Sequence, residues 1–200
     1  MKINIVKLIN FKIKKLYSLI TEEQYQKFFK NSIIHRNDYV REIAWFLLTE
    51  KNVKTLAELM KNKNVLSLAS GMGYAELWLR EKFNINIKIT DKGNSNYFNN
   101  GLPQYVERID ALQALDKYQN WYNMVFLAWP PYQNDLALNI LKRMKKNSDM
   151  IIIGEGYDGC VANDDFWEEI EDKEKYIVRE IYDFDSFCGI NDYITIIKKL

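Results

Sequence analysis

The chain has 200 residues, of which 48% are hydrophobic and 28% charged, and its formal net charge is +1. This composition is typical of a globular protein, and the length fits one domain, or one domain with an N-terminal extension. No run approaches the roughly 18 apolar residues of a membrane span, and Lys12, Lys14 and Lys15 interrupt any signal-peptide core. We therefore expect a cytoplasmic protein without a membrane partner.

The small net charge conceals an uneven distribution. Residues 1–63 contain 13 Lys and Arg against 6 Asp and Glu, which gives +7, whereas residues 64–200 contain 15 against 21, which gives −6. A basic N-terminal segment on an acidic body is a possible electrostatic footprint for nucleic acid or another polyanion. The same charges are compatible with the solvated faces of amphipathic helices, so both interpretations stay open.

The N-terminal third of the chain is predicted to be helical. Helix fits residues 2–20 better than strand, and Thr21-Glu-Glu-Gln24 is a capping-box pattern that predicts a helix to about Lys30. A second helix is expected after Asn37-Asp38, because the residues that follow have the spacing of one apolar helical face. That face comprises Tyr39, Val40, Ile43, Ala44, Phe46 and Leu47.

Thr55-Leu-Ala-Glu58 is another capping box and predicts a short helix that ends near Asn62. After this helix the spacing of apolar residues changes. Seven strand candidates follow, at 65–69, 85–90, 105–109, 123–128, 150–154, 176–183 and 192–198. Helical stretches lie between most of them, at 74–83, 111–118, 134–146 and 163–172. Strands that alternate with helices indicate βαβ units and a parallel sheet.

The last two strand candidates have no helix between them. Only Asp183 to Asn191 connects them, which is short enough for an antiparallel pair. The runs Met124–Ala128 and Met150–Ile153 are apolar throughout, as expected of central parallel strands covered on both faces. We predict an α/β fold, with a seven-stranded, mostly parallel sheet, helices on both faces and a C-terminal antiparallel hairpin, preceded by N-terminal helices.

A glycine-containing turn, Ser67-Leu-Ala-Ser-Gly71-Met-Gly73, joins the first strand candidate to a helix candidate. The next strand candidate ends on an acidic residue, Asp91, eighteen positions after Gly73. Such a turn lets the backbone approach a ligand, the helix N-terminus presents amides to an anionic group, and the acid accepts hydrogen bonds from ribose hydroxyls. The layout therefore predicts a nucleotide-like ligand, with a ligand-free tight turn as the alternative.

Two common nucleotide sites fit less well. The dinucleotide fingerprint needs a third glycine where Glu76 stands, and no Gly-Lys-Ser or Gly-Lys-Thr follows the glycines, as a P-loop requires.

The whole pattern resembles the class I S-adenosylmethionine-dependent methyltransferases, whose seven-stranded sheet ends in the same hairpin. The resemblance covers residues 55–200. It implies the Rossmann-like methyltransferase fold for that part, with residues 1–54 as an N-terminal helical extension. It also implies S-adenosyl-L-methionine as the cofactor.

The resemblance assigns cofactor-binding residues to the ends of the first three strands. Gly71 and Gly73 match glycines of the family's first motif, whereas Ser67 stands where Asp or Glu is usual and Ala69 where the first glycine is usual. Asp91 matches the acid that holds the ribose. Asp110-Ala111 matches the pair beside the adenine.

A fourth motif, Trp129-Pro130-Pro131-Tyr132, resembles the Asn, Asp or Ser followed by Pro-Pro and an aromatic residue of amino methyltransferases. There the first residue accepts hydrogen bonds from the target amine, and the aromatic residue stacks on a flipped-out base. The Trp129 indole donates one hydrogen bond and accepts none. The loop is expected to stack a planar group between Trp129 and Tyr132, while a backbone carbonyl or a carboxylate from a neighbouring strand end orients the amine.

Candidate carboxylates follow the fifth strand in the glycine-rich stretch Gly154–Cys160. Glu155 is the first candidate for an acceptor or general base and Asp158 the second, and a solvated turn is the alternative. Cys160 and Cys188 have no His or second Cys at metal-ligand spacing, so we expect two buried thiols and no metal site.

Three functional hypotheses come from these features. The first is an S-adenosylmethionine-dependent methyltransferase that acts on an unidentified acceptor, such as a planar amine of a nucleobase. The alternative is a catalytically inactive methyltransferase-like module that binds a partner or nucleic acid through its basic N-terminal helices; the departures at Ser67, Ala69 and Trp129 motivate it. A different enzyme with a nucleotide ligand on the same sheet is a third and weaker reading.

Overall fold

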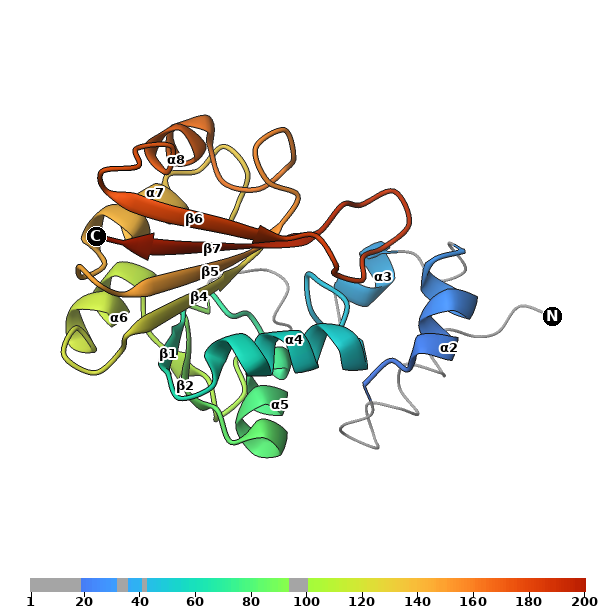
Figure 1. Ribbon diagram of the computed structural model, residues 1–200. Helices are drawn as coiled ribbons and strands as arrows, with labels where there is room; N and C mark the ends of the chain where they lie inside the picture. Colours follow the sequence, from blue (N-terminus) through green and yellow to red (C-terminus); the bar gives the residue numbers. More distant parts are fainter. Residues whose placement is uncertain (1–18, 32–35, 41–42, 94–100) are drawn as a thin grey trace.

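The structure, a computed structural model, describes residues 19–31, 36–40, 43–93 and 101–200 (Figure 1). The three lysines at positions 12, 14 and 15 lie outside these residues, as does most of the helix predicted over 2–20. Ile20 itself is extended and pairs with Thr49 in a parallel bridge. Among the described residues, no helix combines the length and apolarity needed to cross a bilayer.

A single seven-stranded sheet, in the order β3-β2-β1-β4-β5-β7-β6, forms the centre of the fold. The strands are β1 (Asn64–Ser67), β2 (Asn86–Asp91), β3 (Glu107–Arg108), β4 (Met124–Ala128), β5 (Asp149–Gly154), β6 (Tyr176–Ile181) and β7 (Tyr193–Lys199). Strands β1 to β5 are parallel, whereas β7 runs antiparallel to both β5 and β6. The predicted fold class is confirmed, although β1 and β3 are shorter than predicted.

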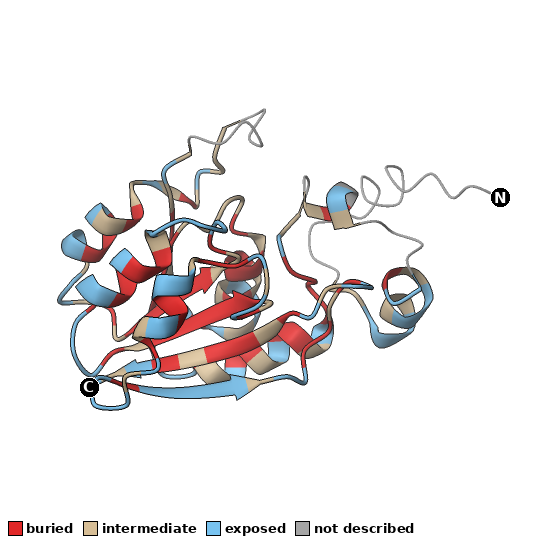
Figure 2. Cartoon of the chain, turned by 90° about the horizontal axis from the view of Figure 1, so that it is seen from above, coloured by how far each residue is buried: buried red, intermediate tan, exposed pale blue. Residues whose placement is uncertain are grey.

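Helices cover both faces of the sheet. On one face lie α4 (Glu50–Met60) and α5 (Tyr74–Phe83), and on the other α6 (Ala111–Lys117), α7 (Leu136–Arg143) and α8 (Asp164–Glu169) (Figure 1). Alternate residues of β4 divide between the two cores, with Phe126 packing towards α4 and α5 and Leu127 towards α6, α7 and α8. Neither face meets water, so the central strands are largely buried (Figure 2), and the runs Met124–Ala128 and Met150–Ile153 within them are apolar.

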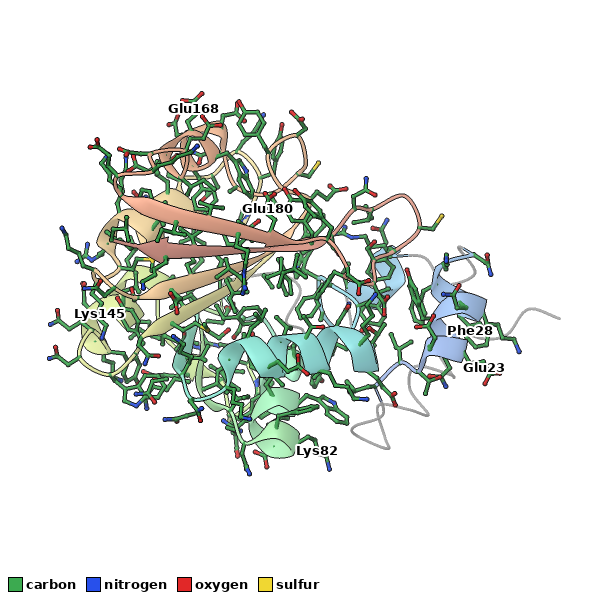
Figure 3. All side chains as sticks on the ribbon, in the orientation of Figure 1. Glu23, Phe28, Lys82, Lys145, Glu168 and Glu180 are labelled. Atoms are coloured by element: carbon green, nitrogen blue, oxygen red, sulfur yellow. The ribbon has the colours of Figure 1, made fainter. Side chains whose placement is uncertain are left out.

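Charged side chains lie on the outer surfaces of both helical layers. Lys82 on α5 and Glu168 on α8 are exposed and point away from the sheet on opposite sides (Figure 3). The outer strand β6 is largely exposed, and Glu180 lies along it (Figure 3).

The N-terminal segment packs against the loop between β6 and β7. It contains α2 (Glu22–Gln24), which continues into the π-helix η1 (Tyr25–Phe29), and α3 (Arg36–Val40). The capping box at Thr21 is confirmed, since its hydroxyl accepts a hydrogen bond from the Gln24 amide at 3.3 Å and the Gln24 side chain accepts one from the Thr21 amide at 3.3 Å. A small apolar cluster joins this segment to the β6–β7 loop, formed by Phe29, Tyr39, Leu47 and Phe187.

The helix predicted to include residues 43–47 is wrong for that part. Helix α3 ends at Val40, and the chain between Ile43 and Thr49 is bent and extended. Phe46 and Leu48 enter the core between the sheet and α4, whereas Leu47 enters the cluster with Phe187. Adjacent side chains that point to opposite sides need the two-residue period of an extended chain, which overrides the helical spacing.

The capping box predicted at Thr55 is also wrong. Helix α4 begins six residues earlier, where the hydroxyl of Thr49 accepts a hydrogen bond from the Asn52 amide at 3.1 Å. Thr55 lies within the helix, and its hydroxyl donates to the Lys51 carbonyl at 3.0 Å. The predicted domain boundary after residue 54 therefore falls inside α4, and the division into two domains stays a prediction.

Asn52 connects the start of α4 to the β6–β7 loop by side-chain hydrogen bonds. Its side-chain amide donates to the carbonyls of Leu47 at 2.9 Å and Asp185 at 2.8 Å, and its carbonyl accepts the Asp185 amide at 2.8 Å. Asn52 is fully buried, so no water replaces these bonds if the side chain is removed.

We expect Asn52→Ala to lower the free energy of unfolding by about 2–4 kcal/mol, because it leaves buried backbone donors and acceptors unpaired. Urea denaturation followed by circular dichroism measures the change. Glu58→Ala, at an exposed position on the same helix, is the matched control and should change the value by no more than about 0.5 kcal/mol. Equal stability of the two variants would contradict the role of Asn52.

Candidate active site

The predicted site residues meet at one edge of the sheet, where β1 to β5 all end; we call it the carboxyl edge. Ser67, Asp91 and Glu155 end or follow β1, β2 and β5, and Asp110 and Trp129 follow β3 and β4. The strand order reverses between β1 and its neighbour β4, since the chain proceeds from β1 to β2 on one side and later returns to β4 on the other. In open α/β sheets, ligands bind in the crevice at such a switch point.

The turn after β1 has an unusual backbone. Ala69, Gly71 and Gly73 have φ angles of 49°, 61° and 63°, in the left-handed region that favours glycine. A Cβ atom on Gly73 would lie 2.7 Å from a methyl carbon of Ile89, so a larger residue would have to displace Ile89 as well as adopt a strained backbone. Ala69 keeps the glycine conformation in spite of its Cβ atom. The turn thus retains the backbone of the glycine motif although one glycine is replaced.

Asp91 faces this turn. One carboxylate oxygen accepts the Gly71 amide at 2.9 Å, and the other accepts the Gly93 amide at 2.6 Å. A carboxylate has about four lone-pair positions, so two remain for a ligand after these bonds. Asp91 is therefore fixed in orientation at the end of β2 and still able to accept hydrogen bonds from hydroxyl groups.

A buried carboxylate lies beneath the turn at Glu76, in the first turn of α5. The Ser67 hydroxyl donates to Glu76 Oε1 at 2.7 Å, and Glu76 is only 4% exposed. Burial raises the pKa of Glu76 to about 7, although the Ser67 hydrogen bond opposes the rise. The acid that the first motif usually has at position 67 is absent, but a carboxylate from α5 reaches the same strand end.

Asp110 and Ala111 lie at the end of β3. The Asp110 side chain caps α6 by accepting the Leu112 amide at 2.9 Å, and Ala111 is buried as the first residue of that helix. The cap fixes where the carboxylate lies at the carboxyl edge. A role for either residue towards an adenine stays a prediction.

The loop after β4 is held by backbone hydrogen bonds on both sides. The Trp129 amide donates to the Ile153 carbonyl at 2.9 Å, and the Pro130 carbonyl accepts the Ala162 amide at 3.3 Å. Trp129 has a φ of 48°, which is rare for an aromatic residue and costs roughly 1–2 kcal/mol. Backbone strain of this kind concentrates at functional sites, so it marks position 129 as a candidate.

Trp129 makes a set of contacts that the sequence did not predict. Its indole nitrogen donates to Asp192 Oδ1 at 2.8 Å. Its ring stacks on Trp45 with 6.2 Å between centroids and 26° between planes. The guanidinium carbon of Arg36, from α3, lies 4.1 Å from the Trp129 ring centroid and 5.2 Å from that of Trp45. The N-terminal segment thus contributes two side chains to the neighbourhood of the fourth motif.

Asp192 is the buried acid of this group, and it is 3% exposed. Burial raises its pKa to about 7; the Trp129 hydrogen bond and the charge of Arg36 oppose this rise, and Glu155 adds to it. Burial also lowers the pKa of Arg36, against the attraction of Asp192 and Glu155. Asp192 Oδ2 and two nitrogens of Arg36, Nε and Nη2, are buried without a hydrogen-bond partner among the described residues.

The carboxylates predicted after β5 have other surroundings. Glu155 accepts the amides of Cys160 at 3.4 Å and Asn191 at 3.5 Å, which ties the loop after β5 to the β6–β7 loop. Asp158 is exposed, and so are Pro131 and Tyr132, whereas Pro130 is buried. Roles for Glu155, Asp158 and the Pro130–Tyr132 segment in binding or catalysis stay predictions.

The two cysteines differ from their prediction. Cys160 and Cys188 are both exposed free thiols, because they lie in the loops that follow β5 and β6 and not in the core. No cluster of His, Cys, Asp and Glu that could hold a metal ion occurs among the residues that the structure describes.

Four residues of the site were missed: Arg36, Trp45, Glu76 and Asp192. A signal for Asp192 existed, since an antiparallel last strand must begin at the edge where its parallel neighbour β5 ends, and Tyr193 is paired with Gly154. Glu76 had none, because a single acid in the first turn of a helix is ordinarily a solvated residue that favours the helix N-terminus.

Comparison with known proteins gives a likeness in fold. No protein-family model matches the chain, and no curated protein sequence matches it. Precorrin-6y C5,15-methyltransferase from Geobacter metallireducens superposes with a TM-score of 0.51 at 13% identity, over 77% of this chain and 90% of that one. The chain has the Rossmann-like methyltransferase fold.

Two further structures superpose less closely. One is the M1A22 tRNA methyltransferase TrmK of B. subtilis, with a TM-score of 0.49 and 14% identity over 74% of this chain and 65% of that one. The other is human N-acetylserotonin methyltransferase with bound S-adenosylmethionine, with a TM-score of 0.48 and 9% identity over 81% of this chain and 54% of that one.

The buried acids of this methyltransferase fold should make its stability depend on pH. Asp192 and Glu76 have pKa values of about 7 in the folded chain, above their ordinary values of 3.8 and 4.5. Between about pH 4 and pH 7 the folded chain keeps protons that the unfolded chain releases, so the free energy of unfolding falls as the pH rises. Asp192→Asn and Glu76→Gln should each make this fall shallower in urea denaturation.

The double variant, Asp192→Asn with Glu76→Gln, should show the shallowest pH dependence of all. Variants whose stability falls as steeply as that of the wild type over this range would show that neither acid is protonated in the folded chain.

Proposed function

We propose that the chain is an S-adenosylmethionine-dependent methyltransferase, with residues 55–200 as the cofactor-binding domain. The observation that carries the proposal is the pairing of Asp91 with the Gly71 amide beside the switch point of the sheet. It sets a fixed carboxylate next to a turn of glycine conformation, which suits a nucleoside with a charged tail. The methyltransferase fold supports the same reading.

The residues at the carboxyl edge fit this cofactor. Asp91 has free lone pairs for two ribose hydroxyls, and Asp110 and Ala111 would lie on the adenine side. The turn from Ser67 to Gly73, with Ala69 and Gly71, opens on the N-terminus of α5, whose amides suit the methionyl carboxylate. When bound, S-adenosylmethionine supplies a methyl group that an acceptor lone pair can take, while the electron pair of the broken carbon–sulfur bond stays on sulfur.

The protein's own contribution is to hold the acceptor in line and to exclude water. A near-attack arrangement requires the reacting atoms to be roughly 3–3.5 Å apart. The strained Trp129-Pro130 loop is well suited to this task, because backbone bonds to β5 and to Ala162 fix it on both sides. We propose a planar amine, such as that of a nucleobase, as the acceptor.

Removing the Asp91 carboxylate should weaken cofactor binding. Hydrogen bonds to a charged group contribute roughly 1.5–3 kcal/mol, so Asp91→Ala should raise the Kd for S-adenosylmethionine and S-adenosylhomocysteine about ten- to a hundredfold or more. Isothermal titration calorimetry measures both ligands. Asp91→Asn keeps one acceptor oxygen for the backbone amides and should lie between the wild type and Asp91→Ala.

A wild-type protein that binds neither ligand at about 1 mM would remove the proposal, since this is far weaker than a working cofactor site. Urea denaturation of each Asp91 variant checks that a loss of binding is not a loss of folding.

The basic N-terminal segment suggests nucleic acid as a partner, and we propose it on the charge of +7 over residues 1–63. Lys12, Lys14 and Lys15 are the clearest candidates for phosphate contacts. Replacing all three by Gln should weaken binding to a duplex oligonucleotide and lower the slope of log K against log salt by about 2–3, roughly one per lost contact. Fluorescence anisotropy at several salt concentrations measures the slope, and binding that does not vary with salt would contradict this partner.

The same partner would serve the alternative function, that of an inactive binding module. Transfer of a labelled methyl group from S-adenosylmethionine into separated nucleic-acid, protein and small-molecule fractions distinguishes the two, because a module without catalysis labels none of them.

A further inference from the structure

All the buried side-chain nitrogen and oxygen atoms that lack a hydrogen-bond partner, among the described residues, belong to two side chains at one place. They are Nε and Nη2 of Arg36 and Oδ2 of Asp192. Buried polar groups in folded proteins are nearly always paired, so a concentration of exceptions calls for an explanation. Both side chains contact Trp129, the first residue of the fourth motif.

The arrangement leaves these atoms in fixed positions. Asp192 Oδ1 accepts the Trp129 indole N–H at 2.8 Å, so the bond fixes the carboxylate and leaves Oδ2 as an acceptor. The guanidinium carbon of Arg36 lies over the Trp129 ring, 4.1 Å from its centroid, and Nε and Nη2 form one forked edge of the guanidinium group. One acceptor and two donors therefore stand beside the same ring.

We propose that these atoms bind the methyl acceptor, with Asp192 Oδ2 accepting its N–H and Arg36 donating to a neighbouring lone pair of the same molecule. The acceptor is then a planar nitrogen base in which an amino group lies next to a ring nitrogen or carbonyl oxygen, as in adenine and cytosine. This inference rests on the proposed methyltransferase function and assigns the role that Trp129, a donor only, is unable to fill.

The chemistry of transfer needs such an acceptor. The lone pair of the amino nitrogen forms the new bond to the methyl carbon, and the nitrogen becomes positively charged. It regains neutrality when one of its protons passes to Asp192 Oδ2, which ends as a neutral carboxyl group. Asp192 thus orients the lone pair before transfer and accepts the proton after it.

The side chains around Trp129 suit a planar ligand, and Asp192 suits the role of acceptor better than the other acids at the carboxyl edge. Trp45 and Trp129 stack on each other, the planar cation of Arg36 lies over both rings, and Trp45 is 39% exposed. Asp192 is better suited to this role than Glu155, because Asp192 Oδ2 is a buried acceptor without a hydrogen-bond partner beside Trp129, whereas Glu155 accepts the backbone amides of Cys160 and Asn191.

Tryptophan fluorescence at about pH 8, where Asp192 with its pKa of about 7 is mostly ionised, tests the assignment with adenosine and cytidine as probes in the presence of S-adenosylhomocysteine. We expect at least one of the two nucleosides to quench the wild-type fluorescence in a saturable manner. Asp192→Asn keeps an oxygen for the Trp129 indole but presents an N–H where the ligand needs an acceptor. It should weaken this binding about ten- to a hundredfold, as for a lost charge-assisted hydrogen bond, and leave binding of S-adenosylhomocysteine unchanged.

Two comparisons isolate the contacts. The N,N-dimethylated form of the bound nucleoside has no amino proton, so it should bind weakly and equally to the wild type and to Asp192→Asn. Arg36→Lys keeps the charge but loses the planar fork, and it should also weaken nucleoside binding. Asp165→Asn and Arg179→Lys, at exposed positions remote in sequence, are the matched controls and should bind like the wild type.

Wild-type protein that binds S-adenosylhomocysteine but neither nucleoside would overturn this inference alone, as would equal nucleoside binding by Asp192→Asn or Arg36→Lys and the wild type. Wild-type protein that fails to bind S-adenosylhomocysteine would overturn the proposed function itself. Calorimetry on the same samples separates the two results.

Discussion

The hydrogen bond from the Trp129 indole to Asp192 links the main parts of the candidate site. Trp129 follows β4 and Asp192 precedes β7, so the bond passes across the end of β5, the strand that lies between them. It is possible because β7 is antiparallel and begins at the edge where β4 and β5 end. The C-terminal hairpin therefore closes the sheet and also brings a buried acid to the loop that follows β4.

The two halves of the edge are stabilised by different means. At the ends of β1 and β2 the backbone fixes the geometry, because two backbone amides hold Asp91 and the turn depends on residues with left-handed φ angles. At the ends of β4 and β7 side-chain contacts fix the geometry, and two of these side chains, Arg36 and Trp45, come from the N-terminal segment. Asn52 and the apolar cluster around Phe187 both attach that segment to the β6–β7 loop.

The sequence predicted the parts of the fold that depend on local pattern. The apolar runs of β4 and β5 and the nine-residue connection from Asp183 to Asn191 were sufficient for a parallel sheet with a terminal hairpin. The prediction from sequence was wrong where tertiary packing overrides the helical spacing of apolar residues, as at Phe46 and Leu47, which enter different apolar clusters. The glycine turn and Asp91 were found because they follow strands directly.

The departures from the family pattern share one physical form. At position 67 a serine replaces the usual acid, and it donates to the Glu76 carboxylate at 2.7 Å; at position 129 a tryptophan replaces the usual acceptor, and it donates to the Asp192 carboxylate at 2.8 Å. In each case the residue at the strand end has become a donor, and a buried carboxylate from another element stands beside it. Burial raises the pKa of both acids to about 7. A buried carboxylate without a partner is costly, and the donor at each strand end offsets part of that cost. The ends of the adjacent strands β1 and β4 therefore share one arrangement, in which a side-chain donor holds a buried carboxylate that another element supplies.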